Sequence, residues 1–382
     1  MNAEELRALA IDRTGLDDFG PDGYREGFEL LVKSFDTEAK LSEIGEMAIT
    51  EQVVGALANR LRIVDAHTQD PTLAEAPVQR PLIVLGLPRT GTTFLSYLLD
   101  CDPENRSLMR WESSNSLPPP RAETFTTDPR IEEARVGQEM LDGLNPQFKA
   151  MHYEAPDGPT ECVTVLAQDF KSLLWETVAN VPSYGEWLLD CDETSAYEYH
   201  RSVLQLLQSQ APGRWSLKTP HHCLALDELM ATYPDARLIM THRDPVTVTA
   251  STCSLVRSLS GTFSDGDHQA YINERFPRIF EVAMDRVAEF RDRRPEVQWC
   301  DVAYHDLVRD PVGTVGRIYD TFGEQVSPEA ERRMEDYAAA NPKGVHGAHS
   351  YDADSLGLDV AALRERFEPY TRRFGEFTFA SS

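Results

Sequence analysis

The sequence lacks the features that mark a membrane, redox or metal-binding protein. No run of apolar residues approaches the ~18 that span a bilayer, and the amino terminus, MNAEELRALAIDRTGLDDFG, is acidic with no apolar signal-peptide core. The six cysteines are scattered, and even the closest two, Cys162 and Cys191, are too distant for a C-x-x-C pattern. We therefore expect a cytoplasmic protein with reduced thiols, no membrane span and no bound metal.

Basic residues are also scarce. The 382 residues include 37 Lys or Arg and 63 Asp or Glu, which gives a formal net charge of −26. Such a chain is repelled by nucleic acid and by anionic membranes, so neither is expected as a partner. Any anion site must be a local basic pocket. With 41% hydrophobic and 26% charged residues, the chain has the composition of a folded globular protein with a sizeable core.

The apolar pattern divides the chain into a helical preface and an α/β body. Residues 2 to about 70 carry apolar side chains at helical spacing. The segment DPTLAEAPVQRP, which contains three prolines, then precedes LIVLGL, a run that is typical of a buried parallel strand. We therefore assign 1–75 to a helical N-terminal extension and 76–382 to an α/β domain.

Strands and helices alternate through the body. GRWSLK, ARLIMTHR and VQWCDVAY have the character of strands, and helices are expected between them. Asp244 and Pro245 suit the N-cap and first position of one helix, and another helix over 158–179 is expected to carry Glu161. The alternation predicts a P-loop-type parallel sheet flanked by helices, with helical insertions.

The stretch PLIVLGLPRTGTTFLSYLLD has phosphate-loop spacing but lacks the usual lysine. Gly86, Gly91 and Thr93 fit G-x-x-x-x-G-K-[ST], whereas Thr92 takes the lysine position. A strand, turn and helix in this order direct backbone N–H groups and the positive end of the helix dipole at one spot. Arg89 lies inside the loop and can donate a fork of hydrogen bonds to phosphate or sulfate. The loop therefore predicts an anion site for a ligand that needs less neutralisation than a triphosphate.

These residues resemble the sulfotransferases that use 3′-phosphoadenosine 5′-phosphosulfate (PAPS). The 5′-phosphosulfate loop of that family has the form P-[KR]-[ST]-G-[ST]-[ST], which is matched at every place by Pro88, Arg89, Thr90, Gly91, Thr92 and Thr93. The family pairs an arginine at a strand end with a serine eight residues later at its 3′-phosphate site, and Arg243 and Ser251 have that separation. The stretch from about 81 to 351 follows the family order and looks most like the bacterial branch with LKTPHH.

The resemblance implies transfer of the PAPS sulfuryl group to a hydroxyl of a small-molecule, lipid or carbohydrate acceptor, with adenosine 3′,5′-bisphosphate (PAP) as product and no metal required. Lys218 of LKTPHH matches the lysine that contacts the sulfuryl oxygens, and His222 matches the histidine of L-K-x-P-x-H. Lys343 and Gly344, in NPKGVHGAHSY, resemble a late loop that folds over the nucleotide. A homodimer is compatible with these features.

Three residues compete to be the catalytic base. An imidazole with a pKa near ~6.5 suits proton abstraction at neutral pH, and only one of two adjacent histidines at a helix start can face a cleft. We favour His222 over His221. Glu161 is the rival, because a glutamate does this work in carbohydrate-type relatives. Arg89 stays protonated, so it would stabilise the leaving phosphate and cannot donate a proton.

Two other functions stay open. A metal-dependent small-molecule kinase of P-loop fold would bind a nucleoside triphosphate with magnesium, and the missing loop lysine argues against it. A non-catalytic protein would bind PAP without turnover, and the LKTPHH segment argues for chemistry instead.

Overall fold

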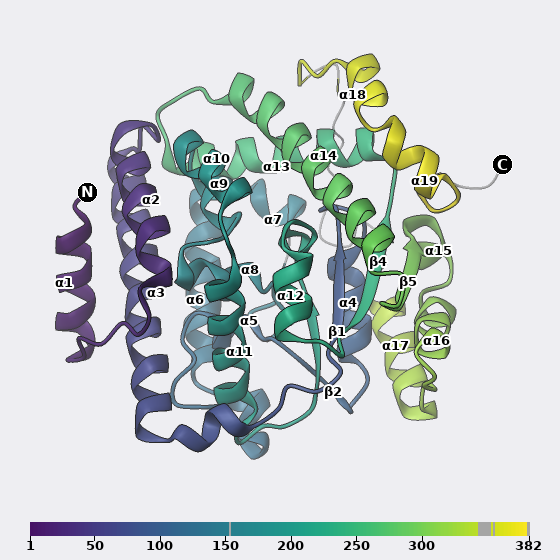
Figure 1. Cartoon of the computed structure of the whole chain (residues 1–382), viewed down its shortest axis with the longest axis horizontal. Coiled ribbons are helices and arrows are strands. Elements are labelled where there is room, and N and C mark those ends of the chain that lie inside the picture. The colour runs from purple at the N-terminus through teal and green to yellow at the C-terminus, as the bar shows by residue number, and fades with distance from the viewer. Residues whose placement is uncertain (153, 343–352, 354–355, 380–382) are drawn as a thin grey trace.

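A parallel sheet forms the centre of the computed structural model, which describes residues 1–152, 154–342, 353 and 356–379 (Figure 1). Within these residues the sheet has five strands: β1 (Leu82–Gly86), β2 (Asn105–Ser107), β3 (Arg214–Lys218), β4 (Arg237–His242) and β5 (Trp299–Ala303). They lie in the order β2-β3-β1-β4-β5, and each neighbouring pair is parallel. The predicted α/β fold is confirmed.

Alternate residues of the central strands face opposite layers of helices, as the period of a strand requires. On one side, Ile83 and Leu85 of β1 join a core with α11 (Thr194–Gln208), α12 (Leu226–Thr232), α13 (Pro245–Phe263) and α14 (Gln269–Arg293). On the other side, Leu82 and Val84 pack with α4 (Thr92–Asp100), α16 (Pro311–Thr321) and α17 (Pro328–Ala340). Burial on both faces explains why the β1 sequence is a continuous apolar run.

The expected N-terminal helices are present and lie along one side of the molecule (Figure 1). They are α1 (Ala3–Thr14), α2 (Arg25–Thr37) and α3 (Glu43–Gln69). A second core buries Phe28 of α2 and Leu57 of α3 together with Trp175 of α9 (Leu174–Val178) and Leu188 of α10 (Pro182–Asp190). The first 75 residues therefore share a core with helices inserted in the α/β body.

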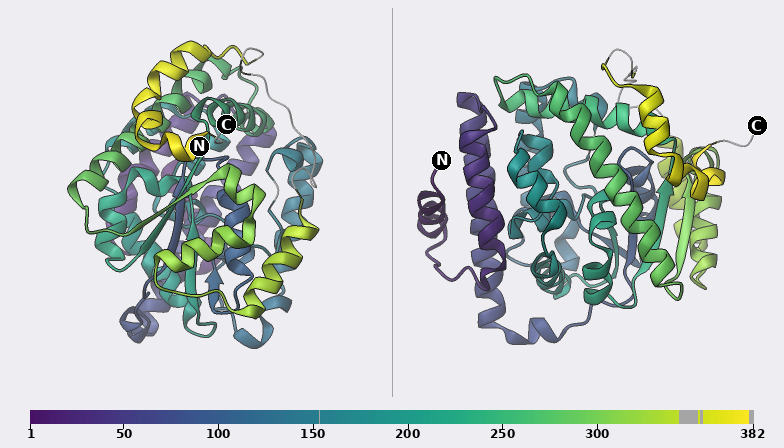
Figure 2. Two further views of the ribbon diagram at one scale, coloured as in Figure 1. Left: turned by 90° about the vertical axis from the view of Figure 1, so that its right-hand side faces the viewer. Right: turned by 45° about the horizontal axis from the view of Figure 1, so that its top comes forward.

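The remaining helices connect and cover these layers. They are α5 (Arg110–Ser113), α6 (Arg130–Leu144), α7 (Phe148–Met151), α8 (Val163–Leu166), α15 (Tyr304–Arg309), α18 (Val360–Arg366) and α19 (Glu368–Thr378). The last two, drawn in yellow in Figure 2, pack against α13 and against β4 and β5 respectively.

The predicted single helix over 158–179 is wrong. The segment APDGPTE contains two prolines and runs without helix, and the remainder divides into α8, a 3₁₀ turn at Ala167–Asp169 and α9, with Phe170 at a positive φ of 55° between them. The Cys162 N–H donates to the carbonyl oxygen of Lys218 over 2.9 Å, and helix α8 begins only after this contact. Glu161 consequently lies beside the end of β3, where Lys218 and Thr219 donate hydrogen bonds to its carboxylate.

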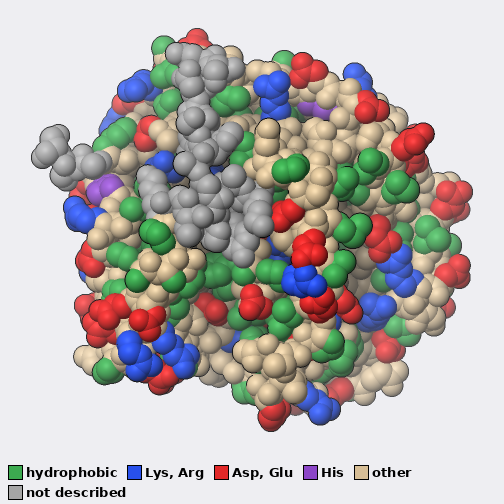
Figure 3. Space-filling model, turned by 180° about the vertical axis from the view of Figure 1, so that it is seen from behind, with side chains coloured by type: hydrophobic (Ala, Val, Ile, Leu, Met, Phe, Trp, Pro, Cys, Tyr) green, Lys and Arg blue, Asp and Glu red, His purple; other side chains and the backbone are tan. Residues whose placement is uncertain are grey.

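The surface retains the acidic character of the composition. On the face shown in Figure 3, acidic side chains are spread across the surface with Lys and Arg interspersed. Among the described helices, none combines the length and apolar character needed to cross a membrane.

Candidate active site

The loop after β1 folds into a turn that presents the start of α4. Gly86, Arg89 and Gly91 have φ angles of 130°, 64° and 91°. A Cβ on Gly86 would lie 2.5 Å from the carbonyl oxygen of Thr241, so glycine is required where β1 passes β4. Gly91 is the N-cap of α4, and no described side chain caps this helix end. The first N–H groups of α4 are therefore positioned to bind an anion.

The three threonines of the loop have different surroundings. The Thr90 hydroxyl donates to the Leu87 carbonyl oxygen over 2.6 Å, and Thr92 is buried. Thr93 is half-buried, and its hydroxyl accepts a hydrogen bond from Lys218 Nζ over 3.4 Å. Thr90 thus uses its hydroxyl inside the loop, whereas Thr93 links the loop to the end of β3.

Arg243, after β4, and Ser251, on α13, both lie next to the loop. Arg243 Nη1 donates to the Arg89 carbonyl oxygen over 2.9 Å, and its guanidinium carbon lies 4.2 Å from the ring centroid of Tyr304. Arg89 Nε donates to Ser251 Oγ over 3.1 Å. Asp244 caps α13 as predicted. The loop motif and the Arg243/Ser251 pair therefore meet in one group of residues. This group, called the basic cluster, contains two arginines and one hydroxyl: Arg89, Arg243 and Ser251.

Lys218, at the carboxyl end of β3, lies beside two carboxylates. Lys218 Nζ donates to Glu161 Oε1 over 2.8 Å and lies 3.7 Å from Glu154 Oε1. The Thr219 hydroxyl donates to Glu161 Oε2 over 3.1 Å. Burial alone would raise the pKa of Glu154, but contacts with His152 and Lys218 lower this pKa to about 2. Glu154 is ionised at neutral pH, so the buried ammonium is compensated by negative charge.

Comparison with known proteins identifies the family. Residues 81–328 match the model of the sulfotransferase family. The chain belongs to this family. The crystal structure of sulfotransferase STF9 from Mycobacterium avium is 36% identical, with a TM-score of 0.90 over 98% of this chain and 96% of that chain. Sulfotransferase STF1 from Mycobacterium tuberculosis H37Rv is also 36% identical, with a TM-score of 0.86 over 97% of this chain and 99% of that chain.

A curated relative carries a more specific name. The omega-hydroxy-beta-dihydromenaquinone-9 sulfotransferase Stf3 of Mycobacterium tuberculosis is 24% identical over 271 residues, which cover 68% of this chain and 67% of Stf3. These similarities confirm the predicted resemblance to sulfotransferases.

Both adjacent histidines of this sulfotransferase are buried, and the preference for His222 over His221 as the base stays a prediction. His222 is 0% exposed, its Nδ1 lies 2.8 Å from the Tyr197 hydroxyl, and its Nε2 has no partner among the described residues. His221 Nε2 lies 2.6 Å from Glu193 Oε2. The reason is that Pro220–Leu224 forms a 3₁₀ turn packed against α14 and β1. Burial holds the pKa of His222 well below its usual value.

Glu161, the rival candidate, is more accessible than His222. Its side chain is 20% exposed, and both of its oxygens are bonded to residues at the end of β3. In this sulfotransferase it is the carboxylate that lies closest to Lys218 among the described residues.

Lys343 and Gly344, expected over the nucleotide, lie outside the described residues. The described part of the sulfotransferase contains no group of three or more His, Cys, Asp or Glu side chains that could hold a metal ion.

Two residues at the site were missed by sequence analysis. Glu154 lies in a proline-containing segment with no recognisable spacing, so nothing in the sequence indicated its approach to Lys218. Tyr304 directly follows β5, and its place at the carboxyl end of a parallel strand was a usable signal. A Cβ on Gly91 would lie 3.1 Å from Tyr304 Cδ2, which shows how closely Tyr304 packs against the loop.

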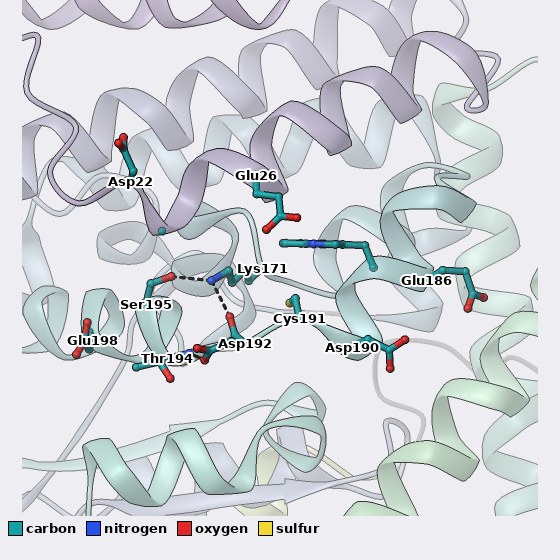
Figure 4. A pocket seen from close by; sticks show the side chains of 12 residues that line it. Asp22, Glu26, Lys171, Glu186, Asp190, Cys191, Asp192, Thr194, Ser195 and Glu198 are labelled. Atoms are coloured by element: carbon teal, nitrogen blue, oxygen red, sulfur yellow. Dashed lines mark hydrogen bonds between the residues drawn. The ribbon is translucent and has the colours of Figure 1, made fainter.

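A cavity of about 910 Å³ lies elsewhere, between the N-terminal helices and α10 and α11 (Figure 4). Its acidic lining residues are Asp22, Glu26, Glu186, Asp190, Asp192 and Glu198. Lys171 Nζ, in the same wall, donates to the Asp192 carbonyl oxygen and to Ser195 Oγ over 2.7 and 2.8 Å. The acidic walls disfavour an anionic ligand.

Proposed function

We propose that this sulfotransferase uses PAPS, transfers its sulfuryl group to a hydroxyl of a small-molecule, lipid or carbohydrate acceptor, and releases PAP. The observation that carries this proposal is that basic side chains lie on two sides of the loop after β1. Arg89 of this loop contacts Arg243 and Ser251, and Thr93 of the same loop contacts Lys218. A nucleotide with an anionic group at each end would fit such an arrangement.

The residues divide between the two ends of the donor. The N–H groups of Gly91, Thr92 and Thr93 at the start of α4 would bind the 5′-phosphosulfate. Arg243 and Ser251 would bind the 3′-phosphate, with Lys343 and Gly344 closing over the nucleotide. Lys218 supplies positive charge beside Thr93, so the donor needs no metal ion in this scheme.

The chemistry is an in-line displacement at sulfur. The acceptor oxygen forms a bond to sulfur while the bond from sulfur to the 5′-phosphate oxygen breaks, and PAP leaves with the bonding electrons. Glu161 takes the acceptor's hydroxyl proton, and Lys218 stabilises negative charge on the sulfuryl oxygens. Donor binding would draw Lys218 toward the sulfuryl group and release one Glu161 oxygen for the acceptor.

Transfer of radiolabelled sulfate from PAPS to a panel of phenols, sterols, sugars and hydroxylated isoprenoid quinols tests this function. The name of the Stf3 relative is the reason to include quinols. We expect labelled product in the absence of magnesium. Binding of PAP with no product across the panel would support the non-catalytic alternative, and turnover of ATP that depends on magnesium would support a kinase.

A further inference from the structure

We propose that Glu154 is a positioning residue that holds Lys218 in its charged form while Glu161 changes from a carboxylate to a carboxylic acid. This inference rests on the proposed function, in which Glu161 takes the acceptor's hydroxyl proton. Lys218 Nζ donates a hydrogen bond to Glu161 Oε1 over 2.8 Å. Once Glu161 is protonated, it no longer supplies negative charge to this contact, so Lys218 needs a second anionic partner.

The burial of Lys218 makes that partner necessary. Its side chain is 1% exposed, so water cannot compensate the ammonium charge. Burial disfavours the charged form of a lysine, which loses its proton readily when no ionised partner is near. The nearby Cys162 thiol supplies no negative charge, since burial raises its pKa to about 12. The 5′-phosphate and the sulfuryl group of the donor both carry negative charge, so a neutral amine would lose its attraction for the donor.

Glu154 is held in place by groups other than Lys218. Its Oε2 accepts a hydrogen bond from the Thr160 hydroxyl over 2.9 Å, and its carbonyl oxygen accepts one from Arg110 Nη1 over 3.0 Å. Its Oε1 is buried, has no hydrogen-bond partner among the described residues and lies 3.7 Å from Lys218 Nζ. A shift of about 1 Å would bring Nζ to the distance of a charge-assisted hydrogen bond. This oxygen is therefore positioned to accept from Lys218 when Glu161 becomes neutral.

The surroundings of Glu154 keep it ionised. Burial alone would raise its pKa, but contact with His152 and the charges of Lys218 and Arg110 lower this pKa to about 2. His152 Nε2 lies 3.5 Å from Glu154 Oε1. With His152 neutral, Lys218 and Arg110 balance the two glutamates in charge. Protonation of Glu161 then leaves a net positive charge beside the anionic sulfuryl group, which favours transfer.

The titration of Lys218 tests this role without any acceptor. The chain contains six lysines, so labelling their ε-carbons with ¹³C gives a simple NMR spectrum, in which Lys218→Arg identifies the Lys218 signal. Glu161→Gln imitates the protonated base with little change of shape. We expect the titration midpoint of Lys218 to lie roughly 1–3 pH units lower in the double variant Glu161→Gln/Glu154→Gln than in Glu161→Gln.

Two further double variants provide the controls. Glu161→Gln/Glu154→Asp keeps the charge and should restore most of the shift, which distinguishes an electrostatic role from simple packing. Glu161→Gln/Glu132→Gln changes an exposed carboxylate of α6 and should leave the midpoint of Glu161→Gln unaltered. Equal midpoints in Glu161→Gln and Glu161→Gln/Glu154→Gln would overturn the inference.

The single variant Glu154→Gln replaces the double variant if the latter lacks a cooperative melting transition. Its Lys218 midpoint should lie below that of the full-length wild type, and an unchanged midpoint would overturn the inference. Binding of PAP to the wild type is measured separately by calorimetry. Failure of PAP to bind would overturn the proposed function alone, because the lysine titration contains no nucleotide.

Discussion

At the scale of single residues, the fold brings the ammonium group of Lys218 and the carboxylate of Glu161 into contact. A buried ammonium is costly unless a carboxylate compensates it, and Glu161 supplies that carboxylate from a segment 57 positions earlier in the chain. The same contact places a proton acceptor next to the group that would bind the sulfuryl oxygens.

Replacing Glu161 by Gln tests the identity of the base. The change keeps the shape and removes the proton acceptor, so turnover should fall by roughly 10²–10⁴ while PAP affinity is retained. Single-turnover rates and calorimetry measure the two effects. His222→Gln is the comparison, and near-normal turnover in Glu161→Gln together with a collapse in His222→Gln would return the role to the histidine.

Several buried histidines should make the protein sensitive to mild acid. Burial lowers the pKa of His200 to about 3 and also lowers the pKa values of His222 and His242, which favours the neutral form of each in the folded state. The unfolded chain binds protons at these positions below pH ~6.5, and unfolding is therefore favoured as pH falls. Each histidine contributes up to about 1.4 kcal/mol per pH unit below that point.

Urea unfolding between pH 7.5 and 5.5 measures this slope, in a range chosen to lie above the usual carboxylate pKa values. His200→Gln removes one of these groups and should flatten the dependence. An identical pH slope in wild type and His200→Gln would show that the buried histidine does not control acid sensitivity.

At the scale of elements, a buried ion pair joins α9 to α14. Arg275 Nε and Nη2 donate to the two carboxylate oxygens of Glu176 over 2.7 and 2.9 Å, and both side chains are almost fully buried. Arg275 Nη1 also donates to Glu186, whose side chain is 50% exposed.

Glu176→Gln leaves the Arg275 charge buried with reduced compensation and should lower the free energy of unfolding by about 3–5 kcal/mol. Glu186→Gln alters the exposed partner and should cost less than about 1 kcal/mol. Chemical denaturation measures both values, and a similar small loss in the two variants would contradict the account.

Elements specified by local sequence were predicted well, whereas those decided by distant contacts were not. The β1 strand, the Asp244 cap and the positive φ angles of Gly86 and Gly91 are local features, so their patterns were sufficient. The extended course around Glu161 depends on pairing with the end of β3, and the burial of His222 depends on packing against α14. The contact between Arg89 and Ser251 likewise joins elements that the loop motif does not relate.

At the scale of the whole molecule, the N-terminal helices are tied to the sulfotransferase body by the core that contains Trp175 and Leu188. The division at residues 75 and 76 stays a prediction about sequence organisation. A chain of residues 76–382 would expose this apolar surface to water, and we expect it to aggregate or to lack a cooperative melting transition. A soluble fragment with a cooperative transition and wild-type PAP affinity would show that the helices are dispensable.

The central claim is that this acidic molecule contains a metal-independent site for a nucleotide with anionic groups at both ends. Thermal unfolding of the full chain in EDTA, with and without PAP, tests it most directly. At a PAP concentration 100 times its dissociation constant, binding should add about 2.7 kcal/mol to the free energy of unfolding and raise the melting temperature. No shift with millimolar PAP, or a shift produced by ATP only when magnesium is added, would contradict the account.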